Sequence, residues 1–189
     1  MPTNLQSHRI DATSIFDTDL TIRLADRNWP DGRKIMQLKD FIAQNAILPA
    51  IKVANKKQLF QELSNRAAIV SGIGEREIFD ALWQREKLGS TGAGNGIAIP
   101  HGKLAKAGRM FGIFVRLDSP VDFDATDGIP VDLVFALIAP ETAGADHLKA
   151  LAQIARTFRD ASFTTVLRAT RDEAGIFALL TGVPTSHAA

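Results

Sequence analysis

The apolar residues between positions 55 and 89 follow a helical period. We predict a first helix over residues 58–69, after a capping Asn55 and before Gly72. Its apolar positions recur at near-helical spacing, namely Leu59, Phe60, Leu63, Ala67 and Ile69. A second helix is predicted from Glu75 towards Gly89, because this stretch has acids in its first turn and cations in its last. Both helices therefore precede a glycine-containing break.

The pattern then changes to short apolar runs, which predict strands over residues 97–99, 110–117 and 131–138. The third run is almost continuously apolar, as expected for a strand covered on both faces. Helical segments follow near 146–159, 162–169 and 171–181. Helices, then strands, then helices predict an α/β fold, a single layered domain with a mixed β-sheet flanked by helices. The strand phenylalanines Phe111, Phe114 and Phe135 are expected in its core.

Residues 1–33 differ from the rest of the chain. They contain five aspartates and no lysine, and their apolar residues are sparse and not periodic. We predict a flexible N-terminal extension over 1–33, a domain over 34–183 and a C-terminal tail over 184–189. The first residues place acids and hydroxyls where a signal peptide needs an apolar core. We therefore expect a cytoplasmic protein.

Composition excludes several classes of function. The 22 basic and 21 acidic residues among 189 give a net charge of +1, which offers no electrostatic basis for binding nucleic acid. The longest apolar run is broken by Asp132 and falls short of the roughly 20 residues of a spanning helix, so no membrane insertion is expected. The absence of cysteine excludes disulfides, thiolate metal sites and a cysteine nucleophile. Four aspartates between residues 118 and 127 fit no calcium loop, and a solvated turn is preferred.

Only four histidines remain for chemistry. His8 and His187 fall in the predicted extension and tail, and we assign them no role. His101 follows a short apolar run and stands between Pro100, with its fixed φ, and the flexible Gly102. Such a residue is rigidly placed with little bulk around it, so another macromolecule could reach it. The alternative is a turn histidine that bonds a neighbouring carbonyl.

The loop before His101 favours a functional role. Four glycines accompany Ser90, Thr91 and Asn95 between positions 89 and 96, and such a loop offers backbone N–H groups to an anion. It is no nucleotide-binding loop, because it lacks a Gly-Lys-Ser/Thr ending and precedes a strand instead of following one.

The run GSTGAGNGIAIPHGKL, preceded by REK and followed by PVDLVFALIAP, resembles the enzyme IIA proteins of the bacterial phosphotransferase system. The likeness is to the fructose/mannitol type, most closely its nitrogen-regulatory branch, and it covers about residues 36–182. The block FDA-TDG-PVDL and His147 also occur in the expected order. Ala93 departs from the larger aliphatic residue usual in the family, which implies looser loop packing there.

The resemblance implies that His101 accepts a phosphoryl group on Nε2 from an HPr-like phosphocarrier protein of the NPr type, without metal or cofactor. It also implies that His147 and Arg85 assist at the same site. By spacing alone, His147 could be a packed histidine at the start of a helix, and Arg85 could be a helix-terminal cation that complements the dipole. A guanidinium can bind two phosphoryl oxygens at once.

The predicted function is therefore a phosphotransferase component that acts as a regulatory phosphocarrier. The resemblance implies target proteins such as potassium transporters, sensor kinases or stringent-response enzymes. The alternative is a sugar-specific enzyme IIA that passes phosphate to a separate IIB protein; a fused IIB of that type would need a cysteine, which this chain lacks. A binding module without phosphotransfer is a third class, disfavoured by the presence of His101, His147 and Arg85 together.

Overall fold

The computed structural model describes residues 37–182, which belong to one compact unit. The predicted extension (1–33) and tail (184–189) lie outside the described residues. Helices and strands follow in this order: η1 (Leu38–Asp40), β1 (Ile42–Ile51), α2 (Lys56–Ser71), α3 (Glu75–Lys87), β2 (Gly92–Gly94), β3 (Ile97–Ala98), β4 (His101–Leu104), β5 (Phe111–Val121), β6 (Val131–Pro140), η2 (Glu141–Ala143), α4 (Gly144–Phe158), α5 (Ala161–Ala169) and α6 (Glu173–Thr181).

The strands form one mixed sheet in the order β1-β5-β6-β3-β2, with β4 also paired to β6. β5 and β6 are antiparallel neighbours, whereas β1 runs parallel to β5. β3 and β4 both pair in parallel with β6, the first along its beginning and the second along its end. The break between β3 and β4 therefore falls at Ile99 and Pro100, directly before His101.

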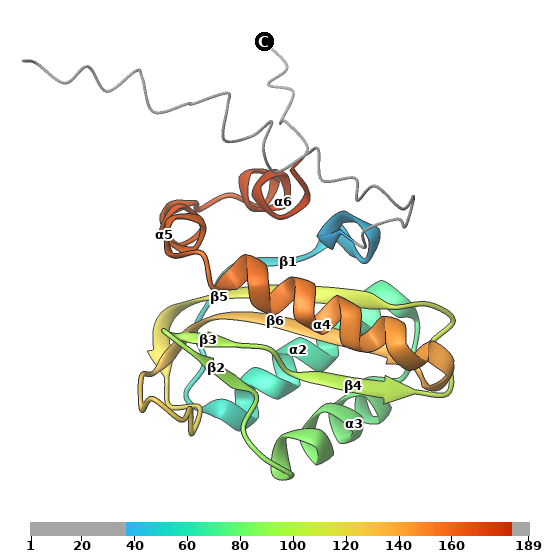
Figure 1. The fold of residues 1–189 in the computed structure, drawn as a ribbon. Helices are drawn as coiled ribbons and strands as arrows, with labels where there is room; N and C mark the ends of the chain where they lie inside the picture. Colours follow the sequence, from blue (N-terminus) through green and yellow to red (C-terminus); the bar gives the residue numbers. More distant parts are fainter. Residues whose placement is uncertain (1–36, 183–189) are drawn as a thin grey trace, which may run out of the picture. The chain divides into compact units, whose positions relative to one another are not determined.

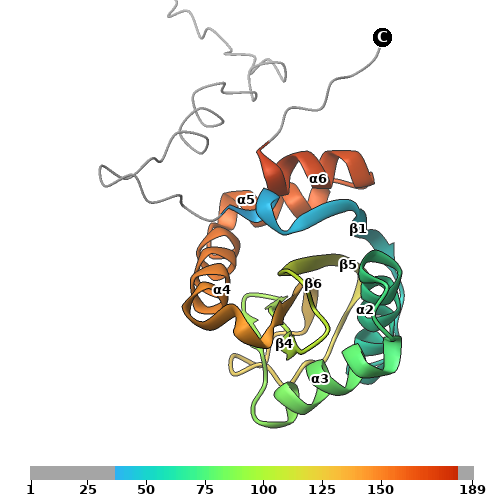
Figure 2. The same cartoon turned by 90° about the vertical axis from the view of Figure 1, so that its right-hand side faces the viewer.

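Helices cover both faces of this sheet. Figure 2 shows α4 on one side and α2 on the other, with the strands between them. α3 packs against β4, and α6 lies beside β1 and η1. In Figure 1, α5 and α6 follow α4 and return towards β1. This α/β architecture confirms the fold class predicted from the sequence.

Local signals explain the two helices before the glycine-rich loop. The Asn55 side chain accepts a hydrogen bond from Gln58 N–H at 3.0 Å, and Gly72 ends α2 with φ at 73°. α3 carries Glu75 and Glu77 in its first turn and Arg85 in its last, as the charge pattern predicted.

The predicted order of elements was wrong at β1, a ten-residue strand that precedes both helices. Its burial does not alternate, and Pro49 lies within it, so no period-two pattern marks it in the sequence. Two further strands were not predicted. β2 lies inside the segment treated as a loop, and β4 begins at His101, where the sequence suggested the end of a strand.

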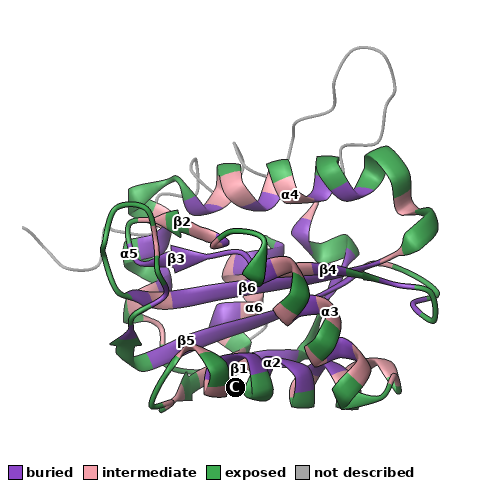
Figure 3. Cartoon of the chain, turned by 90° about the horizontal axis from the view of Figure 1, so that it is seen from below, coloured by how far each residue is buried: buried purple, intermediate pink, exposed green. Residues whose placement is uncertain are grey.

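Aromatic residues fill the core on both faces of the sheet. Phe114 and Phe135 contact Phe158 of α4, whereas Phe60 of α2 contacts Phe123. The three phenylalanines predicted in the core are all buried. A Cβ atom at Gly112 would lie 2.6 Å from the Phe135 ring, so the bare backbone there makes room for that ring. Figure 3 shows the buried strands between helices whose outer sides are exposed. None of the helices described between residues 37 and 182 has the length and apolar character needed to cross a membrane.

Candidate functional site

His101 begins β4, opposite Leu137 of β6, and its imidazole is fixed from two sides. Nδ1 lies 2.9 Å from the carbonyl oxygen of Ile99, and Nε2 lies 3.1 Å from Nε of Arg85. A carbonyl only accepts and a guanidinium only donates, so Nδ1 carries the proton and Nε2 presents its lone pair. The bond to a neighbouring carbonyl, which the sequence offered as an alternative to function, is present. It leaves Nε2 as the nucleophilic nitrogen.

The electrostatic surroundings keep this imidazole neutral. Burial lowers the pKa of His101 from 6.5, and the nearby Arg85 guanidinium lowers it further. The hydrogen bond to Ile99 and the carboxylate of Glu86 act in the opposite direction. His101 is therefore unprotonated near pH 7, which is the state in which Nε2 can attack an electrophile.

His147 lies in the first turn of α4 and is buried. Its ring centroid is 5.6 Å from that of His101, with the two rings tilted by 54°. Burial lowers the pKa of His147 as well, with smaller contributions from His101 and Lys103. Its Nδ1 has no hydrogen-bond partner within residues 37–182. α4 begins at Gly144, two residues before the Asp146 predicted from sequence.

Arg85 reaches His101 from the last turn of α3. Its Nη1 donates to the carbonyl oxygen of Gly89 at 3.0 Å while its Nε donates to His101. The helix-end position predicted for Arg85 is therefore correct, and its side chain also contacts the candidate nucleophile. The structure thus brings together the three residues His101, His147 and Arg85, which come from a strand and two helices.

The glycine-rich loop differs from the open anion cradle that its composition suggested. Three of its backbone N–H groups donate to side chains: Thr91 to the Glu86 carboxylate, Gly92 to the Ser90 hydroxyl, and Asn95 to the Asp127 carboxylate. Asn95 and Gly96 have φ of 56° and 77° in the turn that joins β2 to β3. These three N–H groups are therefore already used within the protein.

Sequence reasoning missed Glu86 and Lys56. The Glu86 side chain is 4% exposed and forms an ion pair with Lys56, with Oε1 and Nζ 2.8 Å apart. The available signal was its spacing, because Glu86 follows Ile78 and Leu82 at steps of four on the buried face of α3.

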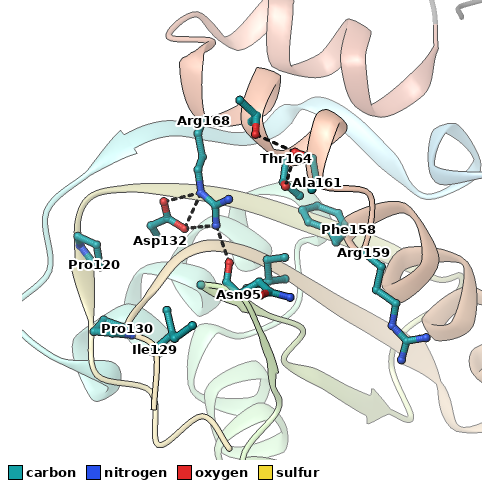
Figure 4. Close-up of a pocket in the computed structure, with 13 residues that line it drawn as sticks. Asn95, Pro120, Ile129, Pro130, Asp132, Phe158, Arg159, Ala161, Thr164 and Arg168 are labelled. Carbon is teal, nitrogen blue, oxygen red and sulfur yellow. Dashed lines mark hydrogen bonds and ion pairs between the residues drawn. The ribbon is translucent and has the colours of Figure 1, made fainter. Parts of the chain in front are cut away.

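A cavity of about 480 Å³ lies elsewhere, beside α5 (Figure 4). Arg168 binds both carboxylate oxygens of Asp132 there and also donates to the carbonyl oxygen of Asn95 at 2.8 Å. The lining of this cavity includes none of the three candidate residues. Arg168 thus connects α5 to β6 through Asp132 and to the β2–β3 turn through Asn95.

Several known proteins are similar to this chain in sequence and in fold. The family model described as "Phosphoenolpyruvate-dependent sugar phosphotransferase system, EIIA 2" matches residues 40–182. The "Nitrogen regulatory protein" of Bradyrhizobium diazoefficiens is 56% identical over 153 residues, which are 81% of this chain and all of that protein. The protein of the same description from Klebsiella oxytoca is 38% identical over 77% of this chain and 91% of its own. The crystal structure of Nitrogen Regulatory Protein IIA-Ntr from Neisseria meningitidis has a TM-score of 0.72 and 38% identity, covering 75% of this chain and 97% of that one.

Proposed function

The chain belongs to the EIIA 2 family of the phosphoenolpyruvate-dependent sugar phosphotransferase system, and we propose that it is a regulatory phosphocarrier that accepts a phosphoryl group on His101. Family membership implies phosphotransferase activity in general. The observation that carries the finer proposal is the state of the His101 imidazole, with Nδ1 bonded to Ile99 and the lone pair of Nε2 directed at Arg85.

The proposed transfer balances without a proton moving at His101. The Nε2 lone pair forms a bond to phosphorus while the bond from phosphorus to a histidine nitrogen of an HPr-like carrier breaks. The electron pair of the broken bond returns to the carrier's nitrogen. The proton stays on Nδ1 of His101, which continues to donate to the Ile99 carbonyl. Positioning and charge stabilisation by the protein are then the main catalytic contributions.

Arg85 and His147 have separate roles in this proposal. Arg85 releases Nε2 when phosphorus approaches and turns its guanidinium onto the phosphoryl oxygens, where two parallel hydrogen bonds can form. His147, whose ring lies 5.6 Å from that of His101, donates an N–H to another phosphoryl oxygen. Both residues are donors at the place where negative charge accumulates.

Phosphorylation would add a charge of about −2 to a site that is neutral at His101 beforehand. A change of that size is sufficient to alter an interface, so the phosphorylation state can be read by partner proteins. We propose that the donor is an HPr-like carrier of the NPr type. The readers are target proteins such as potassium transporters, sensor kinases or stringent-response enzymes, in keeping with the description of the relatives as nitrogen regulatory proteins.

The decisive test is incubation with phosphoenolpyruvate, enzyme I and the HPr-like carrier. We expect the wild type to gain one acid-labile phosphoryl group and His101→Ala to gain none. The double variant His8→Ala/His187→Ala is the matched control and should accept phosphate as the wild type does. Acceptance by His101→Ala at the wild-type rate would contradict the proposal. Rapid onward transfer to a purified IIB protein would favour the sugar-specific alternative, whereas capture of targets that distinguish wild type from His101→Asp supports regulation.

A further inference from the structure

Glu86, the residue after Arg85, carries a deeply buried carboxylate. Its side chain is 4% exposed at the end of α3. A carboxylate so far from water loses its hydration and persists in charged form only with strong partners. The partners of Glu86 therefore show what the group is used for.

Two residues surround this carboxylate. Lys56 of α2 places Nζ 2.8 Å from Oε1, and the same ammonium donates to the carbonyl oxygen of Phe123 at 2.7 Å. Thr91 donates its backbone N–H to both carboxylate oxygens, at 3.1 and 3.0 Å, and its hydroxyl to Oε2. Glu86 thus fixes the glycine-rich loop to α3 through Thr91.

The same residue of the loop is connected to the candidate nucleophile. The carbonyl oxygen of Thr91 accepts from the N–H of Ile99 at 3.0 Å, and the carbonyl oxygen of Ile99 accepts from Nδ1 of His101 at 2.9 Å. A continuous series of contacts therefore runs from Glu86 through Thr91 and Ile99 to the imidazole. Arg85 contacts the opposite nitrogen from the same turn of α3.

We propose that Glu86 is a positioning residue for phosphoryl acceptance, which holds His101 in the Nδ1–H tautomer by fixing Thr91 and, through it, Ile99. Nε2 contacts Arg85 directly, and Nδ1 is connected to Glu86 through Ile99 and Thr91, so both ring nitrogens are held by the last turn of α3. Nε2 is therefore already oriented before the carrier arrives. The hydrogen-bond partner of the second ring nitrogen sets the tautomer and orientation of an imidazole; here that partner is the Ile99 carbonyl, which Glu86 fixes through Thr91. The consequence for transfer rests on the proposed function, but the tautomer is a property of the unphosphorylated protein.

The carboxylate also acts on His101 through its charge. Burial, the largest influence, lowers the pKa of His101, and Arg85 lowers it further, whereas Glu86 raises it. Glu86 therefore preserves part of the basicity that burial removes, and a more basic nitrogen is the better nucleophile.

The test compares Glu86→Gln with Glu77→Gln in the full chain. Glu77 lies on the same helix and bonds Lys106 at 2.7 Å, so the control removes an ion pair by the same substitution without touching Thr91. ¹⁵N NMR of the imidazoles reports the tautomer of His101 directly. We expect the Nδ1–H form to dominate in the wild type and in Glu77→Gln. In Glu86→Gln the ratio of the two tautomers should shift about tenfold towards Nε2–H, and phosphoryl acceptance should slow about tenfold at unchanged carrier KM.

A milder pair of variants addresses the case in which Glu86→Gln fails to fold. Thr91→Val removes only the hydroxyl donor to Glu86, and Thr91→Ser retains it. The tautomer shift should appear in Thr91→Val, whereas Thr91→Ser should keep the wild-type tautomer ratio. A wild-type tautomer ratio in both Glu86→Gln and Thr91→Val would overturn the positioning role. If the wild type accepts no phosphate, the proposed function fails, yet the NMR comparison still decides whether Glu86 positions His101.

Discussion

Strand β6 has a polar cluster near each end, and the two clusters satisfy their polar groups differently. At its beginning, Asp132 and Arg168 bind each other with two-pronged geometry beside the α5 cavity. Towards its end, opposite Leu137, His101 lies with His147 and Arg85. The first cluster is a closed ion pair. In the second, the Nε2 lone pair of His101 accepts a hydrogen bond from Arg85, and the buried Nδ1 of His147 has no hydrogen-bond partner within residues 37–182.

The electrostatics of the two clusters follow the same division. The hydrogen bonds to Asp132 raise the pKa of Arg168, which stabilises the charged form already present. Burial lowers the pKa of both histidines and stabilises their neutral forms. Opposite charges that meet in a protein contribute to the fold, whereas a neutral, desolvated imidazole is kept ready for a reaction. We therefore expect the Asp132–Arg168 cluster to act mainly in stability, and the chemical role proposed above belongs to the histidine cluster.

The largest effect that we expect to separate the two clusters is a slower phosphoryl acceptance in the variant Arg85→Met. We expect phosphoryl acceptance to slow about 100-fold, close to 2.7 kcal/mol of activation free energy, because a charged donor to the phosphoryl oxygens is lost. The free energy of unfolding should change by less than about 0.5 kcal/mol. Transfer kinetics with the carrier and urea unfolding measure the two quantities.

Arg76→Met is the matched control for that variant, since Arg76 lies exposed on the same helix and reaches Asp80 only at 3.9 Å. It should behave as the wild type in both measurements. A loss of stability in Arg85→Met with normal transfer would reverse the assignment of the two clusters.

Arg168→Met should give the opposite result. Removing the guanidinium leaves Asp132 without its partner and frees the Asn95 carbonyl, so we expect the free energy of unfolding to fall by about 2 kcal/mol. Transfer at a temperature where the variant is folded should remain within about twofold of the wild type. Urea unfolding and carrier kinetics check this, and a collapse of transfer at normal stability would count against a structural role for the α5 cluster.

His147→Phe is expected to have a smaller effect on the histidine cluster. The ring size is retained while the proposed donor to a phosphoryl oxygen is lost, which should slow transfer about tenfold. Stability should not fall, because the buried Nδ1 of His147 has no partner within the described residues to lose. Single-turnover transfer and thermal unfolding provide the measurements. A variant that is slow because it is unstable would instead favour a packing role.

The sequence predicted those helices and strands that are marked by a local pattern of residues. α2 follows from helical spacing and its caps, and α3 follows from the acids in its first turn and the cations in its last. The buried strands β5 and β6 follow from apolar runs. β1 was missed because its pairing with β5 joins residues more than sixty positions apart, and its burial pattern does not alternate. Non-local pairing of this kind leaves little trace in a single sequence.

The candidate site divides in the same way. His101, Arg85 and His147 were found from a motif and a resemblance, and the structure brings them together, while their roles remain predictions. The link from Glu86 to His101 was not predicted, because it needs Thr91 and Ile99 to meet across the turn between β2 and β3. The Asp132–Arg168 pair was equally invisible, since its members lie 36 positions apart.

The smallest expected effect is on the pH dependence of stability. An imidazole in the unfolded chain titrates near pH 6.5, and burial lowers the pKa of His101 and His147 in the folded protein. Between the two values the unfolded state binds more protons, so the free energy of unfolding falls as the pH is lowered from about 6.5 towards the folded pKa. Above that window the contribution of the two histidines to stability is fully present.

His101→Gln should therefore lose less stability than the wild type between pH 7.5 and 5.5, measured by urea unfolding. Arg168→Met should keep the wild-type pH slope at a lower stability, because a guanidinium stays protonated throughout this range. Equal slopes in wild type and His101→Gln would mean that His101 is not held neutral by burial.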